Sequence, residues 1–192
     1  MYQWEIIELQ AQTGEWKQAF IHEGLTPKAL QQCQAQWRPM LTAMEEADAH
    51  WNWTGFWETY AQNAAHTFFH LECDGSLQGL LWLESGSFNS WDNQGSPLVY
   101  VHRLCVAPWN RGSALQRRFK PVGMVLLRHA ALWSWDAGFV GRIGLHSLPK
   151  AVHWYQDILK MSAFGKDSNH ENLEYFEFTK VQAVRFLKGQ FG

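Results

Sequence analysis

The sequence predicts a mixed α/β fold, and three observations support this prediction. Two apolar runs at 67–73 and 77–84 flank Asp74-Gly75, a dipeptide typical of the tight turn in a β-hairpin. The next three elements are predicted as a strand, a helix and a strand, at 98–106, 122–137 and 139–146. A final alternating run at 174–180 predicts one more strand. We therefore expect a mixed sheet with one strand–helix–strand crossover.

The N-terminal third supplies further elements. Residues 4–9 read as an opening strand, and Pro27, directly after Thr26, begins a helix, because proline is favoured in the first helical turn. Irregularly spaced apolar residues at 30–44 predict one or two helices, and another helix is predicted at 57–65.

Glycine and proline mark boundaries in the C-terminal half. Residues 85–97 are rich in Gly, Ser and Asn, which is typical of a surface loop. Gly138 is expected to end the helix at 122–137, and Pro149 begins a helix that runs to about Lys160. A short helical tail follows the last strand.

Length and composition favour a single globular domain over residues 1–192. Hydrophobic residues make up 46% of the chain and charged residues 18%, which excludes a disordered protein. A chain of 192 residues can bury a core without disulfides or metals. No repeat, low-complexity tract or charged linker suggests a domain boundary.

The net charge of −2 argues against a surface for nucleic acid, because nucleic-acid-binding domains usually carry a basic excess. A local basic patch is nevertheless present in Arg111, Arg117, Arg118 and Lys120. We expect no nucleic-acid partner.

Cysteine and histidine spacing predicts neither disulfides nor a metal. Cys33, Cys73 and Cys105 are odd in number and far apart. His66 and His70 are four residues apart, but they lie in a strand pattern, so they do not form the histidine pair of a helical metal site.

The first residues, 1–5, lack the charged and apolar regions of a secretion signal. No window of about 20 apolar residues occurs, so no membrane span is predicted. Together with the cysteine pattern, this favours a cytoplasmic protein.

The most specific pattern lies in two central segments, Leu104-Cys105-Val106-Ala107-Pro108 and Arg118-Phe119-Lys120-Pro121-Val122-Gly123. They resemble the central motif of the GNAT superfamily of acyl-CoA-dependent N-acetyltransferases, a strand ending in L-x-V-x-P followed by Q/R-x-x-G-x-G/A at the start of a helix. The resemblance continues through 141–146 and into Ala151-Val152-His153-Trp154-Tyr155, which matches A-x-x-x-Y. In all it covers residues 67–161.

This resemblance implies a mixed, mostly antiparallel central sheet flanked by helices, with a V-shaped opening for the cofactor. It implies acetyl-CoA as the co-substrate and no metal. The loop and the helix N-terminus would hold the pyrophosphate, where N–H groups and the helix dipole favour an anion. The expected cofactor-binding residues are Leu104, Val106, Arg118, Phe119, Lys120, Val122, Gly123 and Met124.

Two registers of the motif are open. In the first, Arg118, Pro121 and Gly123 occupy the defining positions, with Pro121 in place of the usual first glycine. In the second, the motif starts at Arg111-Gly112-Ser113-Ala114. We prefer the first because it alone places Gly123 directly before the apolar helix face at 125–127.

Tyr155 is the expected catalytic acid, because family members often carry at this position the tyrosine that protonates the coenzyme A sulfur. A packing role in the core is the alternative. His102 is the first candidate for the base that removes the amine proton, since histidine titrates near neutral pH. Glu84 and, with less support, Glu72 are the other candidates, on the hairpin strands.

For the acceptor we expect contacts with Trp53, Trp57 and Tyr100. The first two belong to an aromatic cluster with Trp51, where the family builds its acceptor pocket, and aromatic rings can hold a cationic or aromatic amine. Packing between helices and sheet is the simpler explanation for the tryptophans.

These observations favour an acetyl-CoA-dependent N-acetyltransferase in which a small-molecule or peptide amine attacks directly in a ternary complex. One alternative is a catalytically inactive acyl-CoA-binding regulatory or interaction module. Another is a toxin-like acetyltransferase of aminoacyl-tRNA, which the acidic net charge disfavours. Both a monomer and a homodimer are compatible with the sequence.

Overall fold

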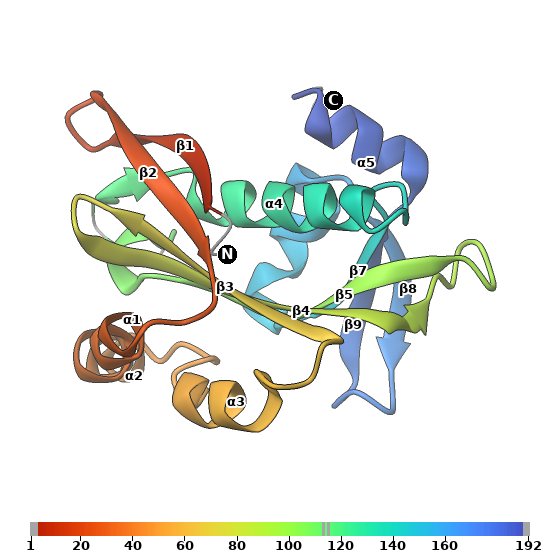
Figure 1. The fold of residues 1–192 in the computed structure, drawn as a ribbon, viewed down its shortest axis with the longest axis horizontal. Helices are drawn as coiled ribbons and strands as arrows, with labels where there is room; N and C mark the ends of the chain where they lie inside the picture. Colours follow the sequence, from red (N-terminus) through yellow and green to blue (C-terminus); the bar gives the residue numbers. More distant parts are fainter. Residues whose placement is uncertain (1–3, 113, 115, 190–192) are drawn as a thin grey trace. The chain divides into compact units, whose positions relative to one another are not determined.

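The computed structural model describes residues 4–112, 114 and 116–189, and their strands form one mixed sheet flanked by helices (Figure 1). The strand order is β6-β1-β2-β3-β4-β5-β7-β9-β8. The registered strand pairs are antiparallel apart from β5 with β7, which is parallel. The predicted mixed, mostly antiparallel sheet is therefore confirmed.

The chain contacts divide the protein into two compact units. Unit 1 comprises Met1–Trp82 with Arg103–Leu126, and unit 2 comprises Leu83–His102 with Leu127–Gly192. Both units are assembled from segments that are distant in sequence, and we describe each by itself. The single domain expected from the sequence stays a prediction.

Unit 1 contains the antiparallel strands β1 (Trp4–Ala11), β2 (Trp16–Glu23) and β3 (His66–Cys73). The predicted opening strand is confirmed, whereas β2 was not predicted. The two-residue strand β6 (Phe119–Lys120) pairs with the end of β1.

Three short helices follow β2 in unit 1. Helix α1 (Pro27–Gln32) begins as predicted, and the Thr26 hydroxyl accepts a hydrogen bond from the Ala29 amide at 3.1 Å. A π-helical turn leads into α2 (Arg38–Ala43). Helix α3 (Trp53–Tyr60) starts earlier than the predicted 57–65, because Asn52 caps it through the Gly55 amide.

The predicted hairpin is confirmed by β3 and β4 (Ser76–Asn89). Its turn residues have the positive φ angles that the tight turn requires, +50° at Asp74 and +68° at Gly75. The predicted loop at 85–97 is wrong in its first part, because β4 continues to Asn89 before β5 (Pro97–Val106) begins.

Unit 2 contains β7 (Ile143–Ser147), β8 (Ser162–Asp167) and β9 (Leu173–Phe178). Strand β7 starts later than the predicted Phe139, because the chain turns at Val140 and Gly141, whose φ angles of +52° and +80° lie outside the β region. Strand β8 was not predicted. Helix α5 (Lys180–Leu187) is the predicted tail.

The crossover helix α4 (Val122–Asp136) agrees with the predicted 122–137. Gly138, at φ +81°, follows its last turn, and the Gly138 amide donates to the Trp135 carbonyl at 3.0 Å. The segment after Pro149 is irregular: a 3-10 turn at Pro149–Ala151 precedes a π-helical turn at Trp154–Ile158, where one regular helix was predicted.

Strands β5 and β7 are registered at only two residue pairs, Val99 with Ile143 and Tyr100 with Gly144. Strand β7 continues to Ser147, so the described pairing stops while both strands continue. The V-shaped opening expected from the resemblance stays a prediction.

A buried ion pair joins the chain after β5 to the segment before α3. Arg111 binds Asp48 with both terminal nitrogens, Nη1 to Oδ1 at 2.7 Å and Nη2 to Oδ2 at 2.5 Å. Burial opposes the charge on Asp48, but the hydrogen bonds from Arg111 outweigh it, so the pKa of the carboxyl lies below its ordinary value. The Cys105 thiol also donates to this carboxylate, at 3.2 Å.

We predict that Asp48→Asn destabilises the protein by about 1–3 kcal/mol, because it removes the carboxylate bound to both terminal nitrogens of the buried Arg111 and leaves Glu46, 3.6 Å from Nη1, as the remaining counter-ion among the described residues. The folded-state pKa of Asp48 is lowered, so the pair stabilises the protein above the ordinary aspartate pKa of about 4 and loses this contribution as pH falls. Urea unfolding at pH 7 and in acid measures both effects.

The control is Asp136→Asn, at the exposed end of α4, which should change the unfolding free energy by less than about 0.5 kcal/mol. A difference between wild type and Asp48→Asn that is equally large in acid and at pH 7 would contradict the electrostatic explanation.

Candidate active site

The loop before α4 is fixed by a buried asparagine. Asn110 donates to Gln78 Oε1 at 2.8 Å, and its own Oδ1 accepts the Phe119 amide at 2.8 Å. The Arg118 amide donates to the Trp109 carbonyl at 3.0 Å. The loop therefore enters the helix in one defined conformation, with the amides of Arg118 and Phe119 used inside the protein.

The first turn of α4 provides the amides that remain for an anion. The Val125 amide donates to the Pro121 carbonyl, so the amides of Val122, Gly123 and Met124 precede the first hydrogen bond of the helix. They lie at the positive end of a 15-residue helix. Exposed Lys120 lies directly before this turn.

Helix α4 starts directly after the Arg118 segment, as the preferred register requires. Arg111 instead follows a 3-10 turn, and both terminal nitrogens of its guanidinium are hydrogen-bonded to Asp48. Ser113, which belongs to the alternative register, lies outside the described residues. The Arg118 guanidinium lies 4.8 Å from the Trp109 ring, a cation–π contact, and side-chain movement would be needed before it could bind a phosphate elsewhere.

The two predicted pantetheine contacts, Leu104 and Val106, are partly buried residues of β5 in unit 1. The Val106 carbonyl already accepts a hydrogen bond from Arg111 Nε at 3.0 Å. A carbonyl oxygen has two lone pairs, so this contact still permits a second hydrogen bond.

Unit 2 brings both candidate bases together. His102 Nε2 lies 2.5 Å from Glu84 Oε2, and both side chains are partly buried. The Tyr100 ring lies edge-on to the His102 ring with the ring centroids 4.8 Å apart. His102 and Tyr100 thus share one face of β5, as the strand period predicts. His102 and Glu84, which the sequence offered as alternative bases, are hydrogen-bonded to each other.

A chain of hydrogen bonds starts at the buried Tyr100. Its hydroxyl lies 2.7 Å from His146 Nδ1, and His146 Nε2 lies 3.1 Å from Asp167 Oδ2. The same carboxylate oxygen lies 2.7 Å from His170 Nδ1. The His170 side chain is 42% exposed, so the chain connects a buried hydroxyl with solvent.

The charges along this chain are set by its surroundings. Burial lowers the pKa of His146, so at neutral pH its imidazole is neutral and can accept the Tyr100 proton. Hydrogen bonds from the Asn169 amide and from the two histidines hold the pKa of Asp167 below its ordinary value. A neutral histidine between a tyrosine and a carboxylate can pass a proton in either direction.

Sequence reasoning did not single out His146, Asp167 or His170. His146 lies two residues after Gly144 and therefore on the same face of its strand. Only the structure shows that Gly144 pairs with Tyr100, which brings His146 to the Tyr100 hydroxyl. No comparable signal marks Asp167 and His170, because the strand that carries Asp167 was not recognised.

Tyr155, the predicted acid, is buried in the π-helical turn of unit 2, beside Trp154 and Phe176. Among the described residues, none hydrogen-bonds to its hydroxyl, so this proton is not engaged inside the protein. Burial raises the pKa of the phenol, so it stays protonated throughout the physiological range.

The tryptophans predicted to contact the acceptor lie in the core of unit 1. Trp53 is 3% exposed and packs edge-on against Trp51 and Phe56. Trp57 is partly buried against Phe68. These contacts favour the packing explanation for Trp53, which has no exposed surface for a substrate.

A second aromatic group lies in unit 2. Trp91, with 47% of its surface exposed, packs against Tyr175 with the ring centroids 4.5 Å apart. Buried Glu177 fixes the Trp91 backbone, accepting the Trp91 amide at 2.6 Å and the Ser90 hydroxyl at 2.6 Å. It also accepts the Tyr175 hydroxyl at 2.9 Å.

The three cysteines are free and buried. Burial raises the pKa of the Cys33 thiol to about 12 and that of Cys73 to about 11, and it raises that of Cys105 well above the ordinary value. None is a reactive thiolate at neutral pH, so a covalent acyl-cysteine intermediate has no support. No helix in the described part of the chain is long and apolar enough to cross a membrane.

No family model and no curated protein matches the sequence. Solved structures are similar. The GNAT domain of PAT from S. lividans has a TM-score of 0.61 at 12% identity, covering 90% of this chain and 96% of that one. FeeM, an N-acyl amino acid synthase from uncultured soil microbes, has a TM-score of 0.57 at 13% identity, covering 87% and 95%.

A third similar structure is a mutant of the AtaT toxin bound to the C-terminus of the antitoxin AtaR. Its TM-score is 0.54 at 17% identity, and the alignment covers 87% of this chain and 95% of that one. Because such alignments span most of this chain and nearly all of each neighbour, the chain has the fold of the GNAT acetyltransferases.

Proposed function

We propose that the protein is an acyl-CoA-dependent N-acyltransferase that uses acetyl-CoA. The observation that carries the proposal is the His102–Glu84 pair beside Tyr100, in a chain with the GNAT fold. Acetyl transfer to an amine needs a neutral nitrogen. A lysine-like amine with a pKa near 10.4 costs about 4.6 kcal/mol to deprotonate at pH 7.

His102 meets this requirement as the base. The Glu84 carboxylate can only accept, so the proton between them belongs to His102 Nε2 and the lone pair lies on Nδ1. When Nδ1 takes the amine proton, the adjacent carboxylate stabilises the resulting imidazolium. Glu84 acts through His102 and is a positioning residue.

Tyr100 assists by orienting the acceptor. Its hydroxyl donates to the neutral His146, which leaves the phenolic oxygen as an acceptor for an incoming ammonium group. His146 in turn donates to Asp167, which also accepts from His170, and these hydrogen bonds hold the Tyr100 hydroxyl in this orientation.

Coenzyme A binding is assigned to the first turn of α4. The amides of Val122, Gly123 and Met124 bind the pyrophosphate, and Lys120 adds a positive charge beside them. Tyr155 donates a proton to the coenzyme A sulfur as the thioester breaks, since burial keeps its phenol protonated.

Two other functions make different predictions. A binding module without catalysis would hold coenzyme A but release no free thiol with any amine. A toxin-like enzyme would acetylate aminoacyl-tRNA, and the fold shared with the AtaT toxin is the observation that favours testing it. Thiol release from acetyl-CoA, measured with a panel of small amines, peptides and aminoacyl-tRNA, separates the three.

The first prediction concerns the phosphate site. Gly123→Val should weaken coenzyme A binding about tenfold or more, because a branched side chain in the first turn obstructs the approach of the pyrophosphate to the amides. Isothermal titration calorimetry measures the change. Gly112→Val is the control, since a Cβ there meets only the flexible end of Arg117, at 3.2 Å. A larger loss of coenzyme A binding in Gly112→Val than in Gly123→Val would place the phosphate site in the Arg111 register.

The second prediction concerns the base. His102→Gln should lower kcat/KM by about 10²–10⁴-fold, the usual contribution of a general base, and higher pH should restore part of the rate. Glu84→Gln should have a smaller effect, because it keeps a hydrogen-bonding partner for His102 and removes only the charge. Unchanged pH–rate profiles in both variants would exclude the pair from catalysis.

The third prediction concerns the acid. Tyr155→Phe keeps the ring packing and removes only the hydroxyl, so we expect the wild-type melting temperature and a turnover lower by about 10²–10⁴-fold. Single-turnover measurements isolate the chemical step from product release. A single-turnover rate equal to that of the wild type would leave Tyr155 with only a packing role.

A further inference from the structure

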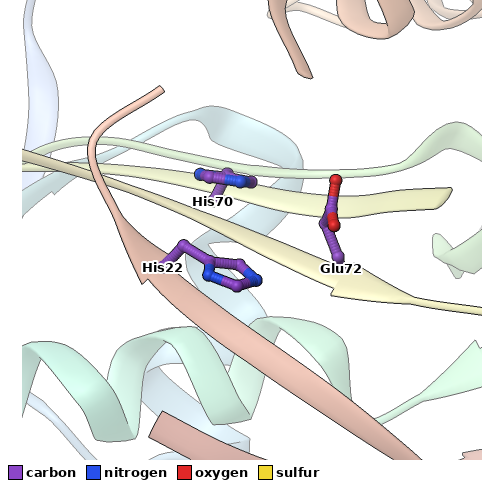
Figure 2. A group of neighbouring side chains, drawn as sticks. All are labelled: His22, His70 and Glu72. Carbon is purple, nitrogen blue, oxygen red and sulfur yellow. The ribbon is translucent and has the colours of Figure 1, made fainter. Parts of the chain in front are cut away.

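A second group of polar side chains lies in unit 1, on strands β2 and β3. His22 and His70 are direct partners in the antiparallel register, and Glu72 lies two residues further along β3, on the same face. One ligating atom of each residue lies within 4.8 Å of the other two. Figure 2 shows the two imidazole rings one above the other, with the Glu72 carboxylate beside them.

The backbone fixes the tautomer of His70. Its Nδ1 lies 2.7 Å from the Gly24 carbonyl oxygen, which can only accept, so Nδ1 carries the proton and Nε2 carries the lone pair. The residue is 3% exposed. A histidine that donates one ring N–H to a backbone carbonyl and presents the other nitrogen is the usual form of a metal ligand.

His22 adds a second nitrogen. Its ring is stacked on that of His70 with the centroids 4.9 Å apart and the planes inclined by 23°.

The side chains of His22, His70 and Glu72 do not satisfy one another's hydrogen-bonding groups. The described contacts include no hydrogen bond between Glu72 and either histidine, although their polar atoms are close. The carboxylates of Glu84 and Asp167, by contrast, hydrogen-bond directly to their histidines. A lone pair on His70 and a carboxylate in one small space repel each other, unless a cation lies between them.

The nearest described cation is Lys28, in the first turn of α1. Its Nζ lies 3.9 Å from Glu72 Oε1, at the limit of an ion pair, and donates to the Gly75 carbonyl at 3.0 Å. The lysine side chain is exposed and already bound to Gly75, so it neutralises Glu72 only weakly.

We propose that His22, His70 and Glu72 bind a divalent transition-metal ion, with Zn²⁺ as the preferred ion. Two imidazoles and one carboxylate are typical zinc ligands, at about 2.0–2.2 Å from the metal, and they leave a fourth position for water. Shifts of the His22 and Glu72 side chains bring the three atoms to these distances, while Gly24 holds His70 in place. The ion would join β2 to β3 where the chain enters α1.

The proposed site differs from the expectation of no metal. Sequence spacing pointed only to His66 and His70, whereas the strand register pairs His70 with His22. The proposal is independent of the acyltransferase activity.

The test uses metal-free, untagged protein titrated with Zn²⁺ by calorimetry and with Co²⁺ by visible absorption. We expect one strong site per chain, and His22→Gln and Glu72→Gln should each weaken it at least about tenfold, the lower limit for perturbing a metal site. Both residues are partly exposed, so these variants should fold, which circular dichroism checks. Zinc should raise the melting temperature of the wild type but not that of the variants.

The matched control is His170→Gln, from another described group of two histidines and a carboxylate, His146, Asp167 and His170 in unit 2. It should leave the zinc affinity unchanged. Absence of zinc binding at micromolar concentrations would overturn the proposal. Binding that His170→Gln abolishes and His22→Gln retains would also overturn it and would place the ion at Asp167.

Discussion

The parallel pairing of Tyr100 with Gly144 determines the geometry of the histidine-rich group in unit 2. Gly144 has no side chain, and a Cβ there would collide with the Tyr175 hydroxyl, which needs this space to reach Glu177. The same register places His146, two residues further on, at the Tyr100 hydroxyl. The absence of a side chain at Gly144 thus permits the packing of Tyr175.

The described histidines that lie close to carboxylates form groups of two kinds. In unit 2, His102 with Glu84 and His146 with Asp167 are closed by hydrogen bonds, which orients the rings and suits proton transfer. In unit 1, His22, His70 and Glu72 are close without being bonded to one another. In the first kind a histidine proton lies between ring and carboxylate, whereas the second is the proposed site for a metal cation. Similar composition therefore leads to different chemistry.

Local signals predicted much of this fold. The Asp74-Gly75 turn, the capped start of α1 and the Gly138 stop of α4 depend on a few neighbouring residues, and the structure confirms them. The acetyltransferase-like order of strand, loop and helix was visible for the same reason. Strands β2 and β8 were missed although each forms a hairpin with its neighbour in sequence, β1 or β9. Neither segment has a regular alternation of apolar and polar residues, and the pairing of β8 is irregular between Ala163 and Lys166.

The candidate site was predicted less completely than the fold. His102 and Tyr100 were placed on one face because strand parity groups residues two apart, and Glu84 was named as a carboxylate on a hairpin strand. That Glu84 bonds to His102 depends on how two strands align, which spacing within one strand does not specify. Asp167 and His170 approach His146 through an unrecognised strand and turn, so no local pattern could identify them.

Glu177 has a consequence for ligand binding. This buried carboxylate accepts hydrogen bonds from Ser90, Trp91 and Tyr175, so an exposed indole is attached to a backbone that is already immobile. Ordering a flexible side chain at an interface costs about 0.5–1.5 kcal/mol. A molecule that rests against Trp91 would meet a surface whose conformational entropy was lost during folding, and association would not have to supply that free energy again.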